Sequence, residues 1–188
     1  SATLHPLQSL ADMITIEEHK PAKRKPKVVL TWAPHIKALP QAVANSFSEW
    51  SLAMGHDLVI THPKGLELNQ DFTRGALIEH DQEKALQDAD FVYVKNWSGF
   101  TDYGKVFDGG QAWMLNAQKM ALTNEARVMH CLPVRRNLEV PDEILDAPYS
   151  LTSQQAGNRL WSAMAVLNRL CGNKVQWPVE TDKAMVTS

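Results

Sequence analysis

Apolar and polar residues follow two different patterns along this chain. Short, nearly continuous apolar runs lie at residues 28–32, 58–61, 91–94 and 127–129, with a further short run at 76–78. Runs of this length are typical of strands buried on both faces of a parallel sheet. Between the runs, apolar residues recur at helical spacing. These segments predict helices at 4–19, about 40–54, 81–86, about 113–120, 141–145 and 154–170.

The alternation of short strands with helices predicts an α/β fold, a three-layer Rossmann-like parallel sheet with flanking helices. We expect this α/β domain to occupy residues 25–152. A helix within residues 1–24 precedes it, residues 153–171 form a C-terminal helix, and residues 172–188 form a tail. Four glycines in residues 98–110 predict an irregular loop.

Composition narrows the class of protein. The chain has 188 residues, is 44% hydrophobic and carries a formal net charge of -2, which favours neither nucleic acid nor a membrane surface as partner. No apolar run approaches the roughly 20 residues of a membrane span. Two cysteines do not form a disulfide framework, so we expect a reducing cytoplasm. Zinc-type ligand spacing and a dinucleotide-binding glycine motif are both absent from the sequence, so neither metal nor cofactor is expected.

Polar residues that could take part in binding or catalysis follow the predicted strands where these strands end. His35 follows the run 28–32, Lys95 follows 91–94, and Cys131 and Arg135 follow 127–129. In parallel sheets, ligands bind outside the carboxyl ends of the strands. The sequence therefore predicts one composite site at this edge of the sheet.

Two helix starts supply further candidates. Pro6 fits the first turn of its helix and leaves His5 and Gln8 near the N-terminus, where exposed N–H groups favour anionic or carbonyl ligands. Arg159 lies near the start of the last helix. Without further information these would be a cap and two solvated side chains.

The octet at 130–137 reads His-Cys-Leu-Pro-Val-Arg-Arg-Asn. Its Leu-Pro bond can be cis, which would turn the Cys131 thiol and the Leu132 carbonyl outward. Arg135 and Arg136 offer planar forks that match carboxylate or phosphate oxygens. The octet resembles the His-Cys-Leu-Pro loop of the transcarbamylases, enzymes that move a carbamoyl group from carbamoyl phosphate to an amine.

The segment His-Pro-Leu-Gln at the start of the first helix is similar to the transcarbamylase His-Pro-x-Gln segment. The resemblance implies that His5 and Arg159 polarise the carbonyl group of carbamoyl phosphate and that Gln8 contacts its NH2 group. It also implies that the Leu132 carbonyl accepts from that NH2 and that Cys131 lines the amine position. His130 is not expected to activate Cys131 directly as a nucleophile, because adjacent strand residues point to opposite faces.

The second substrate can be argued from charge. Ornithine transcarbamylases carry an Asp and a Ser-Met-Gly loop for the α-ammonium group, but residues 93–97 here read Tyr-Val-Lys-Asn-Trp. Lys95 would repel an ammonium and attract a carboxylate, so we expect an N-acylated ornithine whose carboxylates meet Lys95 and Arg135, with His35 nearby. The segment 32–43 resembles the N-succinylornithine enzymes of arginine biosynthesis. N-acetylornithine is the alternative, and free ornithine ranks third.

The resemblance runs from residue 3 to about residue 170 and covers only the second half of a transcarbamylase. The phosphate-gripping Ser-x-Arg-Thr-Arg loop is absent from the sequence. The resemblance therefore implies that residues 1–24 contain the linking helix from a missing N-terminal carbamoyl-phosphate domain, and that the whole enzyme is a homotrimer. We expect little turnover from this chain alone. A non-catalytic ligand-binding module of the same fold is the competing interpretation.

Overall fold

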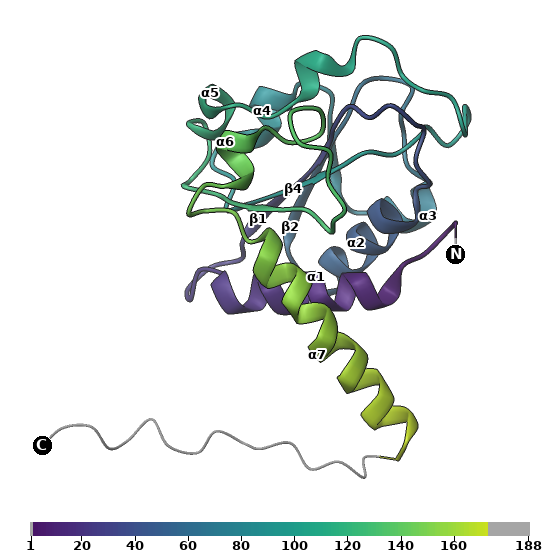
Figure 1. Cartoon of the computed structure of the whole chain (residues 1–188), viewed down its shortest axis with the longest axis vertical. Helices are drawn as coiled ribbons and strands as arrows, with labels where there is room; N and C mark the ends of the chain where they lie inside the picture. Colours follow the sequence, from purple (N-terminus) through teal and green to yellow (C-terminus); the bar gives the residue numbers. More distant parts are fainter. Residues whose placement is uncertain (1, 173–188) are drawn as a thin grey trace, which may run out of the picture.

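The sheet at the centre of the molecule consists of five parallel strands in the order β3-β2-β1-β4-β5 (Figure 1). The structure is a computed structural model and describes residues 2–172. The strands are β1 (Lys27–Trp32), β2 (Asp57–Thr61), β3 (Leu77–Glu79), β4 (Phe91–Lys95) and β5 (Arg127–Met129). The predicted α/β architecture is confirmed. The expected tail lies outside the described residues from residue 173 onward.

Helices cover both faces of the sheet, as Figure 1 shows. They are α1 (Pro6–His19), α2 (Ala42–Ala53), α3 (Gln70–Thr73), α4 (Gln82–Leu86), α5 (Ala117–Met120), α6 (Asp142–Leu145) and α7 (Thr152–Leu170), with a 3-10 helix, η1 (Gly110–Trp113). Ile16 of α1 and Phe47 of α2 belong to one buried cluster, whereas Leu86 of α4 and Ile144 of α6 belong to another. The sheet separates these two cores.

The side chains of β1 show how the sequence builds both cores. Val28, Leu30 and Trp32 enter the cluster with α1 and α2, whereas Val29, and Ala33 just after the strand, enter the opposite cluster. Successive strand residues point to opposite faces, so a continuous apolar run supplies both layers at once.

Helices α1 and α7 cross each other on one face of the molecule, and the C-terminal part of α7 extends away from the sheet (Figure 1). Polar contacts join the two helices. The Asn158 amide donates to the Thr15 hydroxyl at 2.9 Å, and the Ser162 hydroxyl donates to the Leu7 carbonyl at 2.7 Å. The start of the chain is thereby attached to its last described helix.

One predicted helix is interrupted. The pattern indicated a helix over about 113–120, but η1 ends at Trp113, Met114 is extended, and α5 begins only at Ala117. The Asn116 side chain accepts a hydrogen bond from the Lys119 N–H at 2.8 Å and so starts a new helix. The Lys119 ammonium also binds the carbonyl groups of Ala112 and Met114, which holds the chain out of helical geometry.

Asp90 joins three segments just before β4. Its carboxylate accepts hydrogen bonds from the Arg24 guanidinium, from the Lys27 N–H at 2.8 Å and from the Asn124 amide at 2.8 Å. These donors stabilise the ionised form, and the pKa of Asp90 lies below its usual value despite the opposing effect of burial. Its contribution to stability is therefore present above the unfolded-state pKa and is lost as the pH falls through the folded-state pKa.

We expect Asp90→Ala to lower the free energy of unfolding by about 2 kcal/mol at neutral pH, because three donors lose a charged acceptor. Urea denaturation at neutral and acidic pH measures this loss, which should shrink as the pH falls. Asp57→Ala, at an exposed position at the start of β2, is the control and should cost much less. Equal losses for the two variants would contradict the assigned role of Asp90.

Candidate functional site

The candidate site lies at the carboxyl ends of three neighbouring strands. β1, β4 and β5 are adjacent and parallel, so their ends meet at one edge of the sheet. A cavity of about 620 Å³ opens there. Its walls include four of the residues that the sequence predicted for the site: His5, His35, Lys95 and Arg135. The residue before α1, the loop after β1, the start of α2, the end of β4 and the turn after β5 thus converge on one space.

Lys95 is the last residue of β4 and pairs in register with Trp32 of β1. Only 8% of the residue is exposed. Within residues 2–172 the Lys95 ammonium makes no hydrogen bond or ion pair, although its charge acts on the nearby Glu139 carboxylate and Cys131 thiol. Most of the lysine residue is buried and the residue lines the cavity, so an anionic ligand bound there could pair with its ammonium group.

Arg135 lies on the turn after β5. Its backbone N–H donates to the Glu139 carboxylate at 2.8 Å, while the side chain is exposed at the wall of the cavity. The guanidinium makes no hydrogen bond or ion pair with any residue of the described chain. Arg136 differs, because its guanidinium binds Asp142 and Asp146 and is therefore occupied. Of the adjacent arginines, Arg135 is the one available to a ligand.

His130 holds the turn after β5 in place through hydrogen bonds. The Leu132 N–H donates to its Nδ1 atom at 3.0 Å, so in the neutral ring the proton is on Nε2. Nε2 lies 3.7 Å from a Glu139 carboxylate oxygen, and burial lowers the pKa of His130. The backbone N–H of His130 donates to the side-chain carbonyl oxygen of Gln155 in α7 at 2.9 Å. The Leu132-Pro133 bond is cis, as the sequence allowed.

Cys131 is where one expectation fails. The thiol was expected to point outward, but Cys131 is only 7% exposed and lies in the core cluster beneath the turn. Burial raises the pKa of the thiol. The thiol is therefore protonated at neutral pH, which does not suit a covalent nucleophile.

The burial of Cys131 predicts its reactivity. In the native chain, Cys171 is exposed and should react with iodoacetamide at an ordinary rate, whereas Cys131 should react at least about tenfold more slowly. Mass spectrometry of peptides after timed alkylation measures both rates. In denaturant the two rates should become similar. Faster labelling of Cys131 in the native state would contradict the described burial.

The other predicted residues do not line the cavity beside Lys95. Leu132 and Arg159 line a neighbouring cavity of about 560 Å³, which shares Pro133 and Val134 with the first. The two cavities thus lie on either side of the Pro133–Val134 turn. Neither Gln8 nor Cys131 is among the lining residues of either cavity.

Two buried carboxyl groups in or near the site were not predicted from the sequence. Glu139 lines the cavity and is only 1% exposed, and the pKa of its carboxyl group is lowered by His130 and the Arg135 N–H against the opposing effect of burial. Asp12 of α1 is fully buried and accepts from Gln8. The only available signal for Asp12 was its place one helical turn after Gln8.

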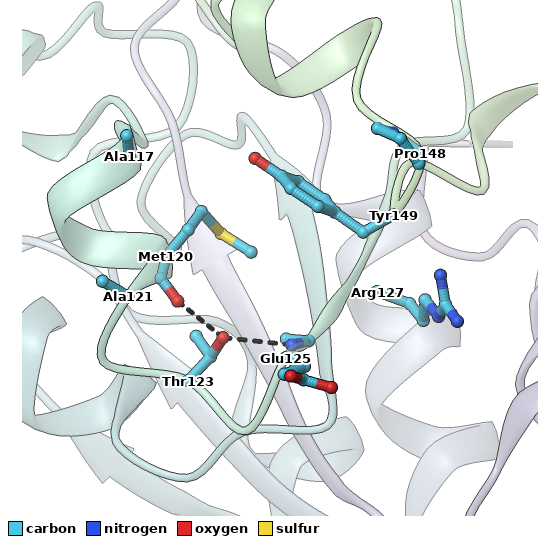
Figure 2. A pocket seen from close by; sticks show the side chains of 9 residues that line it. Ala117, Met120, Ala121, Thr123, Glu125, Arg127, Pro148 and Tyr149 are labelled. Carbon is cyan, nitrogen blue, oxygen red and sulfur yellow. Dashed lines mark hydrogen bonds between the residues drawn. The ribbon is translucent and has the colours of Figure 1, made fainter.

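A third cavity, of about 540 Å³, lies away from this edge (Figure 2). It opens near Arg127, the first residue of β5, between α5 and the segment before α7. Its walls include Met120 and Tyr149, and the Thr123 hydroxyl is occupied by the Met120 carbonyl and the Ala126 N–H. None of the predicted site residues is present there.

Metal-binding clusters and membrane-spanning helices are both absent from residues 2–172. Among residues 2–172, no three His, Cys, Asp or Glu side chains are grouped so that they could hold a metal ion. In the same part of the chain, every helix is too short or too polar to cross a bilayer.

Comparison with known proteins adds independent information. The family model described as aspartate/ornithine carbamoyltransferase, Asp/Orn binding domain, matches residues 40–170. The chain is 51% identical over 175 residues to N-succinylornithine carbamoyltransferase of Bacteroides fragilis, covering 92% of this chain and 55% of that protein. It is 34% identical to N-acetylornithine carbamoyltransferase of Xanthomonas campestris, covering 89% of this chain and 56% of that protein.

Solved structures give the same result. A crystal structure of N-acetyl-L-ornithine transcarbamylase matches with a TM-score of 0.82 and 34% identity, covering 89% of this chain and 57% of that one. A mutant of that enzyme complexed with carbamyl phosphate and N-succinyl-L-norvaline also matches with a TM-score of 0.82, covering 89% of this chain and 56% of that one. The chain spans about half the length of the relatives it matches.

Proposed function

This chain belongs to the aspartate/ornithine carbamoyltransferase family, as its Asp/Orn-binding domain, and we propose that it is the amino-acid-binding half of an N-succinyl-L-ornithine carbamoyltransferase of arginine biosynthesis. The observation that carries the proposal is Lys95, a nearly buried residue at the wall of the cavity whose ammonium has no hydrogen-bond or ion-pair partner within residues 2–172. It calls for an anionic ligand and disfavours a free α-ammonium group.

The amino-acid substrate occupies the cavity beside Lys95. Its carboxylates meet Lys95 and Arg135, and His35 donates or accepts a hydrogen bond at the wall. Acylation removes the positive charge from the α-nitrogen, so the cation that attracts the carboxylates meets no α-ammonium group to repel. The relative at 51% identity is an N-succinylornithine enzyme, which favours a succinyl group. N-acetylornithine is the alternative, supported by the relatives and solved structures at 34% identity.

Carbamoyl transfer joins the two substrates at the turn after β5. The neutral δ-amine attacks the carbonyl carbon, the bond from that carbon to the phosphate oxygen breaks, and the amine proton passes to the departing phosphate. His5 and Arg159 polarise the carbonyl, while Gln8 and the Leu132 carbonyl hold the NH2 group. Cys131 lines the amine position as a neutral thiol. These roles follow the family resemblance, and Arg159 reaches the reaction centre from the other side of the turn.

The rest of the active site comes from outside this chain. An N-terminal carbamoyl-phosphate domain of the same protein grips the phosphate, and the whole enzyme is a cytoplasmic homotrimer. The chain's coverage of about 55% of a relative's length supports a missing domain. The separation of Arg159 from the Lys95 cavity also fits a site that is completed by additional chain.

Turnover measured on two proteins tests this proposal. The longer enzyme is the protein that also carries the N-terminal domain, and it should convert carbamoyl phosphate and N-succinylornithine to the carbamoylated product. The 188-residue chain alone should bind the amino acid but turn over at less than about 1% of that rate. Normal turnover by the 188-residue chain would refute the fragment assignment. Absence of product with the longer enzyme would refute the function.

A non-catalytic binding module is the second candidate, and the order of binding separates it from an enzyme. Calorimetry on the longer protein should show that carbamoyl phosphate strengthens the binding of N-succinylornithine, because the two ligands share one site. A binding module would take one ligand without regard to the other. That result would replace the enzymatic proposal.

A further inference from the structure

A buried carboxyl group holds the side chain of Gln8, the residue proposed to contact the carbamoyl NH2 group. Asp12 of α1 is fully buried, and one of its oxygens, Oδ1, accepts two hydrogen bonds. One comes from the Gln8 amide nitrogen at 2.8 Å and the other from the Gln155 amide nitrogen of α7 at 2.7 Å. A carboxyl oxygen in this position accepts, so both amides must turn their NH2 groups toward Asp12.

This arrangement fixes which way each amide faces. With its nitrogen on Asp12, Gln155 presents its carbonyl oxygen to the His130 N–H, and that hydrogen bond is present at 2.9 Å. Gln8 is only 3% exposed, and its carbonyl oxygen accepts no hydrogen bond from any residue between 2 and 172. The Gln8 oxygen is therefore available to accept a hydrogen bond from a ligand.

The orientation does not depend on the charge of Asp12. Because Oδ1 accepts both amide hydrogen bonds, the second oxygen, Oδ2, is the atom that carries the proton when the group is neutral. Tyr93, Cys131 and Arg159 face the carboxyl group from β4, from the turn after β5 and from α7. Burial raises the pKa of Asp12 to about 7, with Arg159 opposing the shift, and Oδ1 accepts in both protonation states.

We propose that Asp12 is a positioning residue that holds the Gln8 carbonyl oxygen toward the carbamoyl NH2 group. The site thereby selects carbamoyl phosphate over acyl phosphates that carry a methyl group in place of this NH2 group. The inference rests on the proposed function and adds the origin of its donor specificity. An acceptor in a desolvated site is satisfied by NH2 and is left unpaired by CH3, so acetyl phosphate loses a hydrogen bond that carbamoyl phosphate makes. If Gln8 could rotate its amide, its NH2 group would face the ligand and the discrimination would fall.

Competition between the two phosphates in the longer enzyme tests this role. We expect the wild-type enzyme to prefer carbamoyl phosphate over acetyl phosphate, and Asp12→Ala to reduce that preference about tenfold, because Gln8 loses the acceptor that orients it. Asp12→Asn keeps a carbonyl oxygen for the two amides and should retain the preference. Ser9→Ala is the matched control, since Ser9 is buried on the same helix and its hydroxyl has no partner among the described residues.

The outcomes separate the two proposals. A wild-type enzyme that uses neither phosphate refutes the proposed function, whatever Asp12 does. An active wild-type enzyme whose preference survives Asp12→Ala refutes the positioning role. A merely structural Asp12 would weaken the binding of both phosphates equally, and that result also refutes it.

A second measurement needs no variant to fold. In the 188-residue chain, nuclear magnetic resonance should show that the side-chain NH2 protons of Gln8 and Gln155 exchange with solvent at least about tenfold more slowly than those of the exposed Gln111. Exchange of the Gln8 protons at the rate of Gln111 would show that the Asp12 contact is absent and would overturn the inference.

Discussion

Lys95→Met in the longer enzyme should weaken the binding of N-succinylornithine about 100-fold. Methionine keeps the length and apolar stem of lysine but removes the charge, so a substrate carboxylate enters a nearly buried position without its cation. Removing one partner of such a buried charge pair costs about 3 kcal/mol, which corresponds to that factor. Lys95 is suited to this role because it makes no hydrogen bond or ion pair within residues 2–172 that a ligand would have to break. Calorimetric titration of N-succinylornithine into enzyme saturated with carbamoyl phosphate measures the loss.

Lys37→Met provides the matched control for Lys95. Lys37 lines the same cavity but is exposed, and an exposed charge contributes less than about 1 kcal/mol. Its replacement should weaken binding less than about fivefold. Lys95→Glu should go further and move the preference toward free ornithine, because the new carboxylate attracts the α-ammonium group. If the Lys37 and Lys95 variants bound the acyl-ornithine equally well, the carboxylate contact would lie elsewhere.

Asp12→Asn should stabilise the chain at alkaline pH by up to about 4 kcal/mol. Burial raises the pKa of Asp12 from 3.8 to about 7, so the folded state holds a proton that the unfolded state has already lost over this interval. The unfolding free energy of the wild-type chain therefore falls as the pH rises from about 4 to about 7, by about 1.4 kcal/mol for each pH unit. Asparagine fits the same space and carries no titrating group.

Urea denaturation from pH 4 to 9 on both chains measures this effect. The difference in unfolding free energy between the chains should grow through the interval and level off above about pH 7. Groups such as His130 and Glu139 titrate in both chains and cancel in that difference. A difference that stayed constant across the range would show that Asp12 is not held as a neutral acid.

The strand ends were predictable because two local rules were sufficient. Continuous apolar runs mark parallel strands, and parallel strands place the residues that follow them at one edge. His35, Lys95 and Arg135 accordingly line one cavity. His5 was predicted for this site only through a motif resemblance. In the structure α1 lies beside α2, and the His5 backbone N–H donates to the Ser46 hydroxyl at 2.7 Å.

The remaining features depend on contacts between distant segments. Asp12 and Gln155 are 143 residues apart in sequence, and no local pattern indicates that α1 and α7 bring them together. Cys131 is buried because the turn after β5 is pinned by His130, which a cis bond alone could not reveal. The break before α5 requires the Lys119 ammonium to reach back to Met114. Such tertiary contacts override local propensity.

The relative rates of carbamoylation of three amines test the central claim most directly. The longer enzyme, supplied with carbamoyl phosphate, should carbamoylate N-succinylornithine fastest, N-acetylornithine more slowly and free ornithine slowest. This order follows from a cavity whose buried cation accepts carboxylates and excludes an ammonium group. A higher rate on free ornithine than on either acylated amine would contradict the account.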